Sequence, residues 1–425
     1  MIFVKALFSI FCCALVCGQE ITTPSPEELK LKLTFGVDLG LPIEYDIPED
    51  ATTPYLVETR DGYPFEKYDV VTEDGYILGL HRIPYSKKLK NKRSRKPVVF
   101  LMHGLLCSSS VYVINGPNVS LAYELSDRGY DVYMGNARGN TYSKRHVSLS
   151  PNDPKFWIFD WNEIAIYDLP AMINFALKKS KARNLQYIGH SQGGTVHLVL
   201  NSVNPRFRRK ISSAHLLAPG CVMSNTDSPV FKGMAPIFGQ PNEYASQTGF
   251  DVQPTNETID LLGQQACLQE SEDKSICQNL VFLITGYYTN NLVQSNINEI
   301  LKTVPSGSSV RQLLHFSQVV QSKTFGQFNF GEEQNVQKYG TSTPPDYPLK
   351  KIKVPTYFYY SENDIIISTT DIDICASMMS RKAMKGKRLV SLKTFTHMDF
   401  VWGNKTVSRK YLYKNLFKDL RRAGR

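Results

Sequence analysis

Several features that would place this chain among membrane-spanning or cofactor-binding proteins are missing from its sequence. The longest apolar stretch, Ala6–Val16, has about half of the roughly 20 residues that a membrane-spanning helix needs. The 8 histidines include no H-E-x-x-H pair, and neither G-x-G-x-x-G nor a P-loop occurs. We therefore expect no transmembrane anchor, no metal site and no cofactor.

The short apolar stretch predicts a secretory signal peptide instead. Lys5 supplies a positive start, and Val16 and Gly18 are small enough for cleavage before Gln19. We therefore expect residues 1–18 to be removed and the rest to be secreted. Three sequons are predicted glycosylation sites in such a protein: Asn118, Asn256 and Asn404.

Basic residues outnumber acidic ones, and the net charge is +10. They are scattered along the chain, and the densest run, Lys87–Lys96, ends directly before Pro97. This run is typical of an exposed, solvated connecting loop with at most a weak attraction to anionic surfaces. Because no nucleic-acid-binding motif accompanies it, we expect no nucleic-acid partner.

Five cysteines remain after the signal peptide. Cys267 and Cys277 lie close together in a polar segment, and this spacing predicts a local disulfide in an oxidising compartment. An odd number leaves at least one free or intermolecular thiol. The sequence leaves open the states of Cys107, Cys221 and Cys375.

Short apolar runs alternate with helical patterns over most of the chain. Two runs, 68–72 and 76–83, flank Asp74-Gly75 and predict a hairpin. We therefore expect an α/β fold with a mainly parallel sheet covered by helices on both faces. The other predicted strands are 97–102, 130–134, 184–188, 213–217, 356–360 and 389–394, and the predicted helices are 121–128, 161–179 and 195–200.

Residues 222–347, called the inserted segment below, interrupt this alternation. The segment is rich in Asn, Gln, Ser and Gly, and its apolar pieces at 280–284 and 310–320 have helical patterns. An insertion of this size between two core strands predicts a cap over a pocket, with an ordinary surface subdomain as the alternative. The core would then consist of residues 19–221 and 348–425.

The run from Tyr187 to Gly194 contains the pattern G-x-S-x-G around Ser191. In this pattern a serine occupies a tight turn between a strand and a helix, and its oxygen faces a pocket. Gly189 and Gly193 suit the turn because side chains there would crowd it. Ser191 is therefore the candidate nucleophile.

A serine nucleophile needs a base, and the base needs a carboxylate that orients it. In hydrolases built on such sheets the chain order is serine, then acid, then histidine. Asp364 follows the predicted strand 356–360, and His397 is the histidine beyond it. These two are the candidate acid and base. Other acids near this strand are Glu362, Asp371 and Asp373, of which the last two resemble the start of a helix.

Acyl transfer also needs N–H groups that stabilise the negative oxygen of the transition state. One is expected from Gln192, directly after the serine, and the other from the loop after an early strand. That loop is His103-Gly104-Leu105-Leu106, in which Leu105 is the natural donor.

With these residues in place, the chain resembles the gastric and lysosomal acid lipase family of the α/β-hydrolase fold, over nearly the whole mature sequence. The resemblance implies Ser191, Asp364 and His397 as the triad, with Leu105 and Gln192 as the oxyanion hole. The motifs that carry it are His103–Leu106, Asn136–Ser143, Tyr167–Ala171, Gly189–Gly193 and His397–Gly403.

The same resemblance implies neutral lipid esters as substrates, triacylglycerol and in one branch cholesteryl ester, met at an oil–water or membrane interface. It also implies secretion, with the lysosome as the alternative destination. Two other functions stay open: a carboxylesterase for short soluble esters, and a catalytically silent lipid-binding protein on the same scaffold.

Overall fold

The computed structural model describes residues 47–204, 206–241, 280–286 and 289–423. The predicted signal peptide, the sequon at Asn256 and the predicted Cys267–Cys277 disulfide lie outside the described residues.

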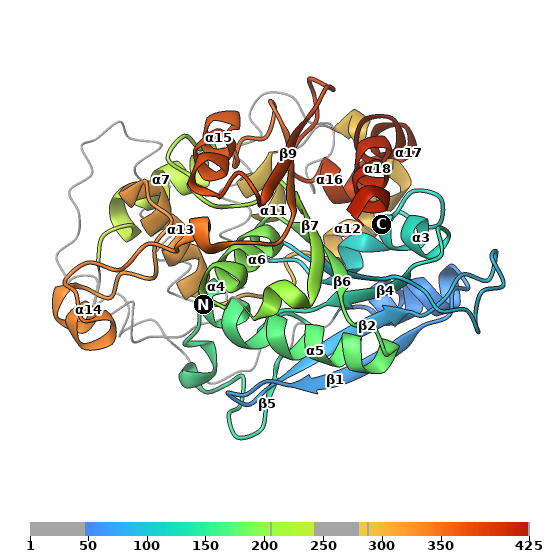
Figure 1. The fold of residues 1–425 in the computed structure, drawn as a ribbon, viewed down its shortest axis with the longest axis horizontal. Helices are drawn as coiled ribbons and strands as arrows, with labels where there is room; N and C mark the ends of the chain where they lie inside the picture. Colours follow the sequence, from blue (N-terminus) through green and yellow to red (C-terminus); the bar gives the residue numbers. More distant parts are fainter. Residues whose placement is uncertain (1–46, 205, 242–279, 287–288, 424–425) are drawn as a thin grey trace.

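A nine-stranded, mostly parallel sheet forms the centre of the molecule (Figure 1). Its order is β1-β2-β4-β3-β6-β7-β8-β9, with β5 beside β2. The hairpin β1–β2 is antiparallel, as predicted, and β4, β3, β6, β7, β8 and β9 run parallel to one another. The strands are β1 (Glu66–Val71), β2 (Tyr76–Ile83), β3 (Val98–Met102), β4 (Asp131–Gly135), β5 (Arg145–His146), β6 (Leu185–His190), β7 (Ile211–Leu217), β8 (Thr356–Ser361) and β9 (Met384–Val390).

The prediction for the last strand was wrong in position. The strand β9 begins at Met384 and ends at Val390, whereas the sequence predicted residues 389–394. The reason is that β9 is an edge strand, in which half-buried and exposed residues alternate. A continuous apolar run is typical of a central strand that is buried on both faces, and this edge strand has no such run.

Helices cover both faces of the sheet, as the side chains of β6 demonstrate. Gln186 donates to the carbonyl of Leu420 in α18, while the next residue, Tyr187, stacks on His197 of α6. Pro170 stands in the first turn of α5, where its missing N–H has no intrahelical acceptor to lose. The helices of the core are α3 (Leu121–Ser126), α4 (Trp161–Glu163), α5 (Leu169–Ser180), α6 (Gln192–Val203), α15 (Thr369–Met378), α16 (Asp399–Trp402), α17 (Lys405–Val407) and α18 (Lys414–Ala423).

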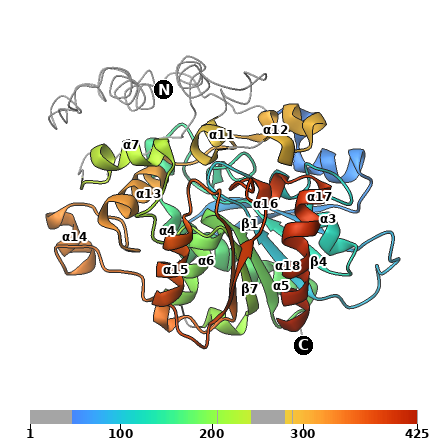
Figure 2. The same ribbon diagram turned by 90° about the horizontal axis from the view of Figure 1, so that it is seen from above.

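The inserted segment joins β7 to β8 and is helical where it is described. The predicted helices at 280–284 and 310–320 are present, and three further helices were not predicted. Phe231 of α7 and Phe316 of α13 pack with ring centroids 6.0 Å apart. Figure 2 shows α7, α11, α12 and α13 on one side of the core. The helices are α7 (Pro229–Phe238), α11 (Leu280–Thr285), α12 (Ile297–Thr303), α13 (Val310–Ser322) and α14 (Glu332–Tyr339).

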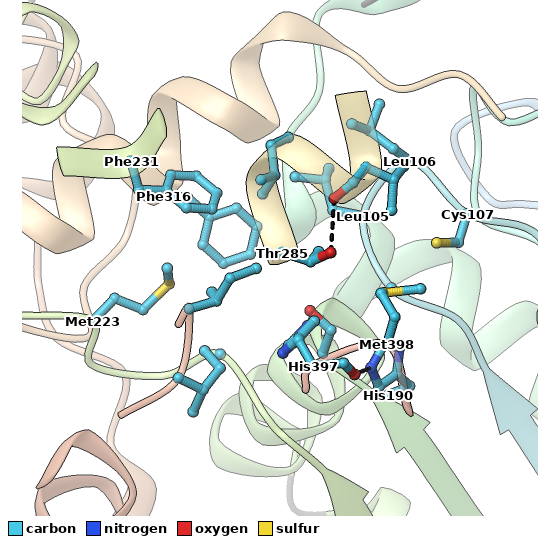
Figure 3. A pocket seen from close by; sticks show the side chains of 17 residues that line it. Leu105, Leu106, Cys107, His190, Met223, Phe231, Thr285, Phe316, His397 and Met398 are labelled. Atoms are coloured by element: carbon cyan, nitrogen blue, oxygen red, sulfur yellow. Dashed lines mark hydrogen bonds between the residues drawn. The ribbon is translucent and has the colours of Figure 1, made fainter. Parts of the chain in front are cut away.

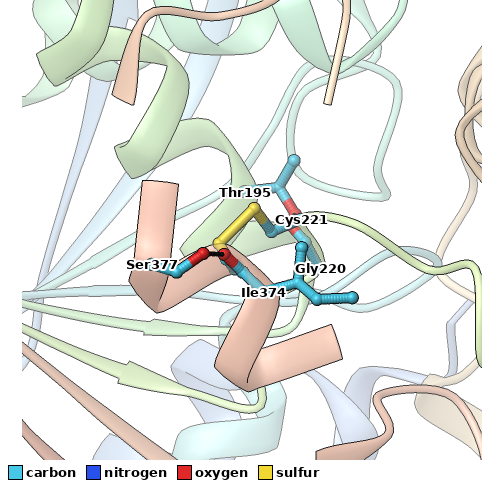
Figure 4. The surroundings of a disulfide bond; sticks show 6 residues. Thr195, Gly220, Cys221, Ile374 and Ser377 are labelled. Atoms are coloured by element: carbon cyan, nitrogen blue, oxygen red, sulfur yellow. Dashed lines mark hydrogen bonds between the residues drawn. A yellow bond between two sulfur atoms is a disulfide. The ribbon is translucent and has the colours of Figure 1, made fainter. Parts of the chain in front are cut away.

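A disulfide joins Cys221, the core residue directly before the inserted segment, to Cys375 in α15 (Figure 4). The two residues are 154 positions apart in the sequence. Cys107 is a free, buried thiol. The sequence had left the states of these three cysteines open, because residues so far apart give no local signal for pairing.

The two described sequons differ in their surroundings. Asn118 is exposed. Asn404 is half-buried and caps α17, and its Nδ2 donates to the carbonyl of Asn290. Because Asn118 is the more exposed of the two, it is the better of these predicted sites.

Candidate active site

Ser191 occupies a strained turn between β6 and α6. Its backbone has φ 52° and ψ −120°, a left-handed φ that a residue with a side chain rarely adopts. A Cβ on Gly193 would lie 2.1 Å from the carbonyl oxygen of Met102, and one on Gly189 would lie 2.4 Å from the carbonyl oxygen of Gly193. The turn therefore needs both glycines of the G-x-S-x-G pattern.

Ser191 lines a cavity. Figure 3 shows other residues of its wall, among them Leu105, Phe316 and His397. The cavity encloses about 490 Å³ of space when its open mouth is included. Ser191 and His397 line it together with Leu105, whereas Phe231 and Phe316 of the inserted segment contribute apolar wall. The cavity thus brings the predicted nucleophile, base and oxyanion loop together under an apolar cover.

His397 and Asp364 form a buried pair beside the cavity. Nδ1 of His397 donates to Oδ2 of Asp364 over 2.7 Å, and both side chains are almost fully inaccessible. Oδ1 of Asp364 accepts hydrogen bonds from the N–H groups of Ile366 and Ile367, each 2.9 Å long. These contacts fix the carboxylate and direct the Nε2 side of the imidazole away from it.

The competing acids have other partners. Glu362 pairs with Lys393 at the surface, and Asp373 pairs with Lys387. Asp371 lies in the first turn of α15 and accepts from the N–H of Asn225. Of the four carboxylates considered in the sequence, Asp364 is the one that contacts His397.

The predicted oxyanion loop passes close to the serine. A Cβ on Gly104 would lie 3.1 Å from Cβ and 3.6 Å from Oγ of Ser191, so a larger residue would crowd the nucleophile. His103 supports this loop: its Nδ1 donates to the carbonyl of Gly104 over 2.7 Å. Its Nε2 accepts from the N–H of Ala137 and from Nδ2 of Asn140.

His103 is neutral in this environment because burial lowers its pKa to about 4. A neutral ring can donate at one nitrogen and accept at the other, as these contacts require. Through Ala137 and Asn140, the motif 136–143 therefore supports the predicted oxyanion loop from behind. The sequence identified the motif 136–143 by its resemblance to a known family, but it did not indicate that the motif supports this loop.

Two further residues hold the backbone that carries His397. Nε2 of His190 donates to the carbonyl of His397 over 3.0 Å, and burial first, then the neighbouring His397, lowers the pKa of His190. Oδ2 of Asp399 accepts from the N–H of Thr396 and from Nδ2 of Asn291, both 2.7 Å away. The link from Asn291 crosses from the inserted segment to the loop that carries the predicted base, and no local pattern in the sequence indicates it.

The described part of the chain contains neither a cluster of metal-binding side chains nor a membrane-spanning helix. Within it, no group of three or more His, Cys, Asp or Glu side chains is arranged to hold a metal ion. The helices of that part are all too short or too polar to cross a membrane.

A strained serine between a strand and a helix, on a mostly parallel sheet of this order, defines an α/β hydrolase. A family described as the alpha/beta hydrolase fold matches residues 97–403, and one described as a partial alpha/beta-hydrolase lipase region matches residues 54–116. Among solved structures, that of DcsB with its substrate analogue aligns with a TM-score of 0.50 at 13% identity, covering 85% of this chain and 98% of DcsB. This likeness concerns the fold alone.

Sequence comparisons narrow the class further. Lipase 3 of Drosophila melanogaster is 45% identical over 361 residues, which cover 85% of this chain and 90% of that protein. The gastric triacylglycerol lipase of Rattus norvegicus is 38% identical over 349 residues, covering 80% and 85%. The chain belongs to the acid lipase family of the α/β-hydrolase fold, as its motifs predicted, and it is an ester hydrolase.

Proposed function

We propose that this chain is a serine lipase that hydrolyses neutral lipid esters, triacylglycerol first and cholesteryl ester as a further substrate. The observation that carries the proposal is that Ser191 and His397 line the same cavity, whose opposite wall is apolar. Asp364 accepts a hydrogen bond from the Nδ1 side of His397. An apolar wall suits acyl chains, and the buried pair suits a base that must accept a proton.

In the proposed reaction Oγ of Ser191 attacks the ester carbonyl carbon while Nε2 of His397 takes the hydroxyl proton. Asp364 stabilises the imidazolium that forms. The N–H groups of Leu105 and Gln192 stabilise the negative oxygen of the tetrahedral intermediate. His397 then protonates the departing alcohol, and a water molecule, activated by the same base, hydrolyses the acyl group from Ser191.

The inserted segment acts in this proposal as a cap. Phe231 of α7, Ile284 of α11 and Phe316 of α13 supply apolar side chains to the cavity wall, opposite the core residues. The long acyl chains of a substrate would contact these side chains and would replace the contacts that they make with the core. This arrangement fits an enzyme that takes its substrate from an oil–water or membrane interface.

A secreted enzyme is the proposal for its location, with the lysosome as the alternative. The signal peptide predicted at residues 1–18 and the disulfide between Cys221 and Cys375 support it, because disulfides persist in oxidising compartments.

The decisive experiment measures fatty acid release by the purified protein and its Ser191→Ala variant from pH 4 to pH 8. The substrates are emulsified triolein, cholesteryl oleate and soluble p-nitrophenyl butyrate. Release from triolein by the wild type alone supports the lipase. Hydrolysis of the butyrate alone would indicate an esterase for short esters, and no release from any substrate would indicate a lipid-binding protein.

A matched pair of variants tests the acid. Asp364→Asn should lower kcat by about 10⁴-fold, as in other serine triads, because the base loses its orienting partner. Glu362→Gln, directly after the same strand but paired with Lys393 at the surface, should leave kcat unchanged.

A further inference from the structure

The fold gathers basic side chains that are scattered in the sequence. The six parallel strands all begin along the same side of the sheet. Ser191 and His397 lie on the opposite side, where the strands end. The connections that lead into them contain many Lys and Arg but a single acid, Asp127. These connections, called the basic edge below, are residues 84–97, 127–130, 181–184, 204, 206–210, 348–355 and 379–383.

Most of these cations are exposed and available. Lys88 pairs with Asp127 and Arg128 with Glu124. For the exposed cations listed next, the described part of the chain offers no carboxylate within ion-pair distance. They include Lys92, Arg93, Arg95, Arg183, Arg208 and Lys351.

The charge is therefore strongly asymmetric. The excess of basic over acidic side chains in the basic edge is greater than the net charge of +10, so the remainder of the chain is net acidic. The C-terminal end of α18 adds Arg421 and Arg422 to the same edge, because the carbonyl of Leu420 contacts Gln186 at the start of β6. Figure 2 shows this end of α18 on the side of the molecule opposite α11 and α12.

The dimensions of the basic edge suit an extended polymer. Neighbouring strands lie about 4.8 Å apart, so the six strand starts extend over roughly 24 Å. Each connection contributes cations at a different point along this line. Arginine guanidinium groups also match tetrahedral oxyanions such as phosphate and sulfate with paired N–H donors.

The geometry points to a linear polysaccharide that carries sulfate groups as the partner of the basic edge. A bilayer fits less well, because peripheral binding to a bilayer uses exposed apolar side chains. Among the described residues at this edge, the large exposed hydrophobic ones are Leu89 and the neighbouring Val203. A bilayer bound here would also lie on the side away from the Ser191 cavity.

A single-stranded nucleic acid fits less well for a related reason. Proteins that bind single strands present aromatic side chains on which bases stack. The aromatic residues of the basic edge are not presented in this way: Tyr85 is half-buried, and Tyr130 and Phe207 are buried.

The consequence for the enzyme is a fixed orientation. A glycan bound at the basic edge leaves the cavity on the opposite edge open to lipid. The enzyme would thus be retained on a sulfated matrix while its active site remains accessible. This inference does not depend on which ester the enzyme hydrolyses.

The test measures binding of the purified full-length protein to immobilised heparin and to desulfated heparin, as a function of salt. Heparin should bind, desulfated heparin should not, and the affinity should fall steeply with salt because counterions are released. Phosphatidylserine vesicles and duplex DNA are measured in parallel. Tighter binding to either of these than to heparin would overturn the assignment of the partner.

Two matched variants place the binding surface. The edge variant carries Lys92→Ser, Arg183→Ser, Arg208→Ser and Lys351→Ser, one change in each of four connections. The control variant removes the same charge elsewhere, with Lys155→Ser, Lys338→Ser, Lys405→Ser and Lys410→Ser, all exposed and outside the basic edge.

The edge variant should bind heparin about tenfold more weakly or worse, from the loss of four charge contacts, while the control variant binds like the wild type. Both should retain ester hydrolysis, which verifies that they fold. Equal weakening in the two variants would mean that net charge alone attracts heparin and would overturn the proposed surface, as would an unchanged edge variant.

Discussion

The side chain of Gln192 donates a hydrogen bond of 2.6 Å from Nε2 to Oε1 of Gln312, and so ties the residue after Ser191 to helix α13 of the inserted segment. Gln312 in turn donates to Oγ of Ser308. Both glutamines are buried. The inserted segment therefore contributes a contact at the turn that carries Ser191, in addition to apolar cavity wall, and we expect this contact to help to fix the Gln192 N–H.

We expect Gln312→Ala to lower kcat for ester hydrolysis by about tenfold with a smaller change in KM, because a less fixed oxyanion donor loses transition-state stabilisation. The substitution also leaves the buried Gln192 amide without its acceptor, at about 1–3 kcal/mol of stability. Gln318→Ala is the control: it lies on the same helix and binds the backbone of Asn329. Equal kcat values for the two variants would contradict the role of Gln312.

The disulfide between Cys221 and Cys375 should contribute substantially to stability, since it closes a loop of 154 residues. The double variant Cys221→Ser/Cys375→Ser should lose about 3–5 kcal/mol of unfolding free energy, measured by denaturant titration. Cys107→Ser, at the buried free thiol, is the reference for a cysteine change without loss of a crosslink. Peptide mapping without reduction that found Cys221 bound to any residue but Cys375 would refute the pairing.

Arg138, in the motif 136–143, has a structural role that a single substitution should reveal. Its buried guanidinium pairs with Asp168 and Asp74, and it lies 3.9 Å from the ring centre of Tyr76. Arg138→Met should destabilise the protein by about 3–5 kcal/mol, because it strands the fully buried Asp168 carboxylate.

The control for this prediction is an exposed arginine. Arg145 pairs with Asp69 at the surface, and Arg145→Met should change stability by less than about 1 kcal/mol. The double variant Arg138→Met/Asp168→Asn should regain part of the loss, since the stranded charge is then removed. Denaturation midpoints at equal slope are the measurement, and a neutral Arg138→Met would contradict the argument.

The parts of the site that the sequence predicted are those with a local signal. Ser191 lies in a glycine pattern that only a tight turn requires, and Asp364 and His397 follow strands in a fixed chain order. The contacts that join distant segments could not be predicted this way. Gln312 with Gln192, and Asn291 with Asp399, depend on how the inserted segment lies on the core, which no spacing in the sequence encodes.

The same distinction applies to the fold. Central strands such as β3 are buried on both faces and appear as continuous apolar runs, so their positions were predicted closely. The edge strand β9 alternates in exposure and was misplaced. The basic edge is a third case, because cations scattered through six connections become neighbours only when the parallel strands align their starts.

Buried histidines should make the protein less stable in acid. Burial lowers the pKa of His197 from 6.5 to about 3, and that of His81 and His215 similarly. A lowered histidine pKa means that the unfolded chain binds more protons below pH 6.5, so stability present at neutral pH is lost as pH falls. From pH 7 to pH 5, His197 alone should account for about 2 kcal/mol.

The variant His197→Phe tests this, because a phenyl ring can keep the stacking on Tyr187 without titrating. Its free energy of unfolding should fall less between pH 7 and pH 5 than that of the wild type, by about 2 kcal/mol. Parallel pH profiles of the two proteins would show that His197 does not contribute to the acid sensitivity.

Asp399 should act in the opposite direction. Burial raises its pKa from 3.8 to about 6, so the folded protein holds a proton that the unfolded chain releases between about pH 4 and pH 6. Its contribution to stability is therefore greatest in acid and is lost as pH rises through 6. Asp399→Asn removes this titration and should steepen the loss of stability from pH 7 to pH 5 by about 1 kcal/mol. The two variants should change the pH dependence of the unfolding free energy in opposite directions: His197→Phe makes it flatter and Asp399→Asn makes it steeper. A flatter dependence for Asp399→Asn would mean that this carboxyl is ionised in the folded protein at pH 5.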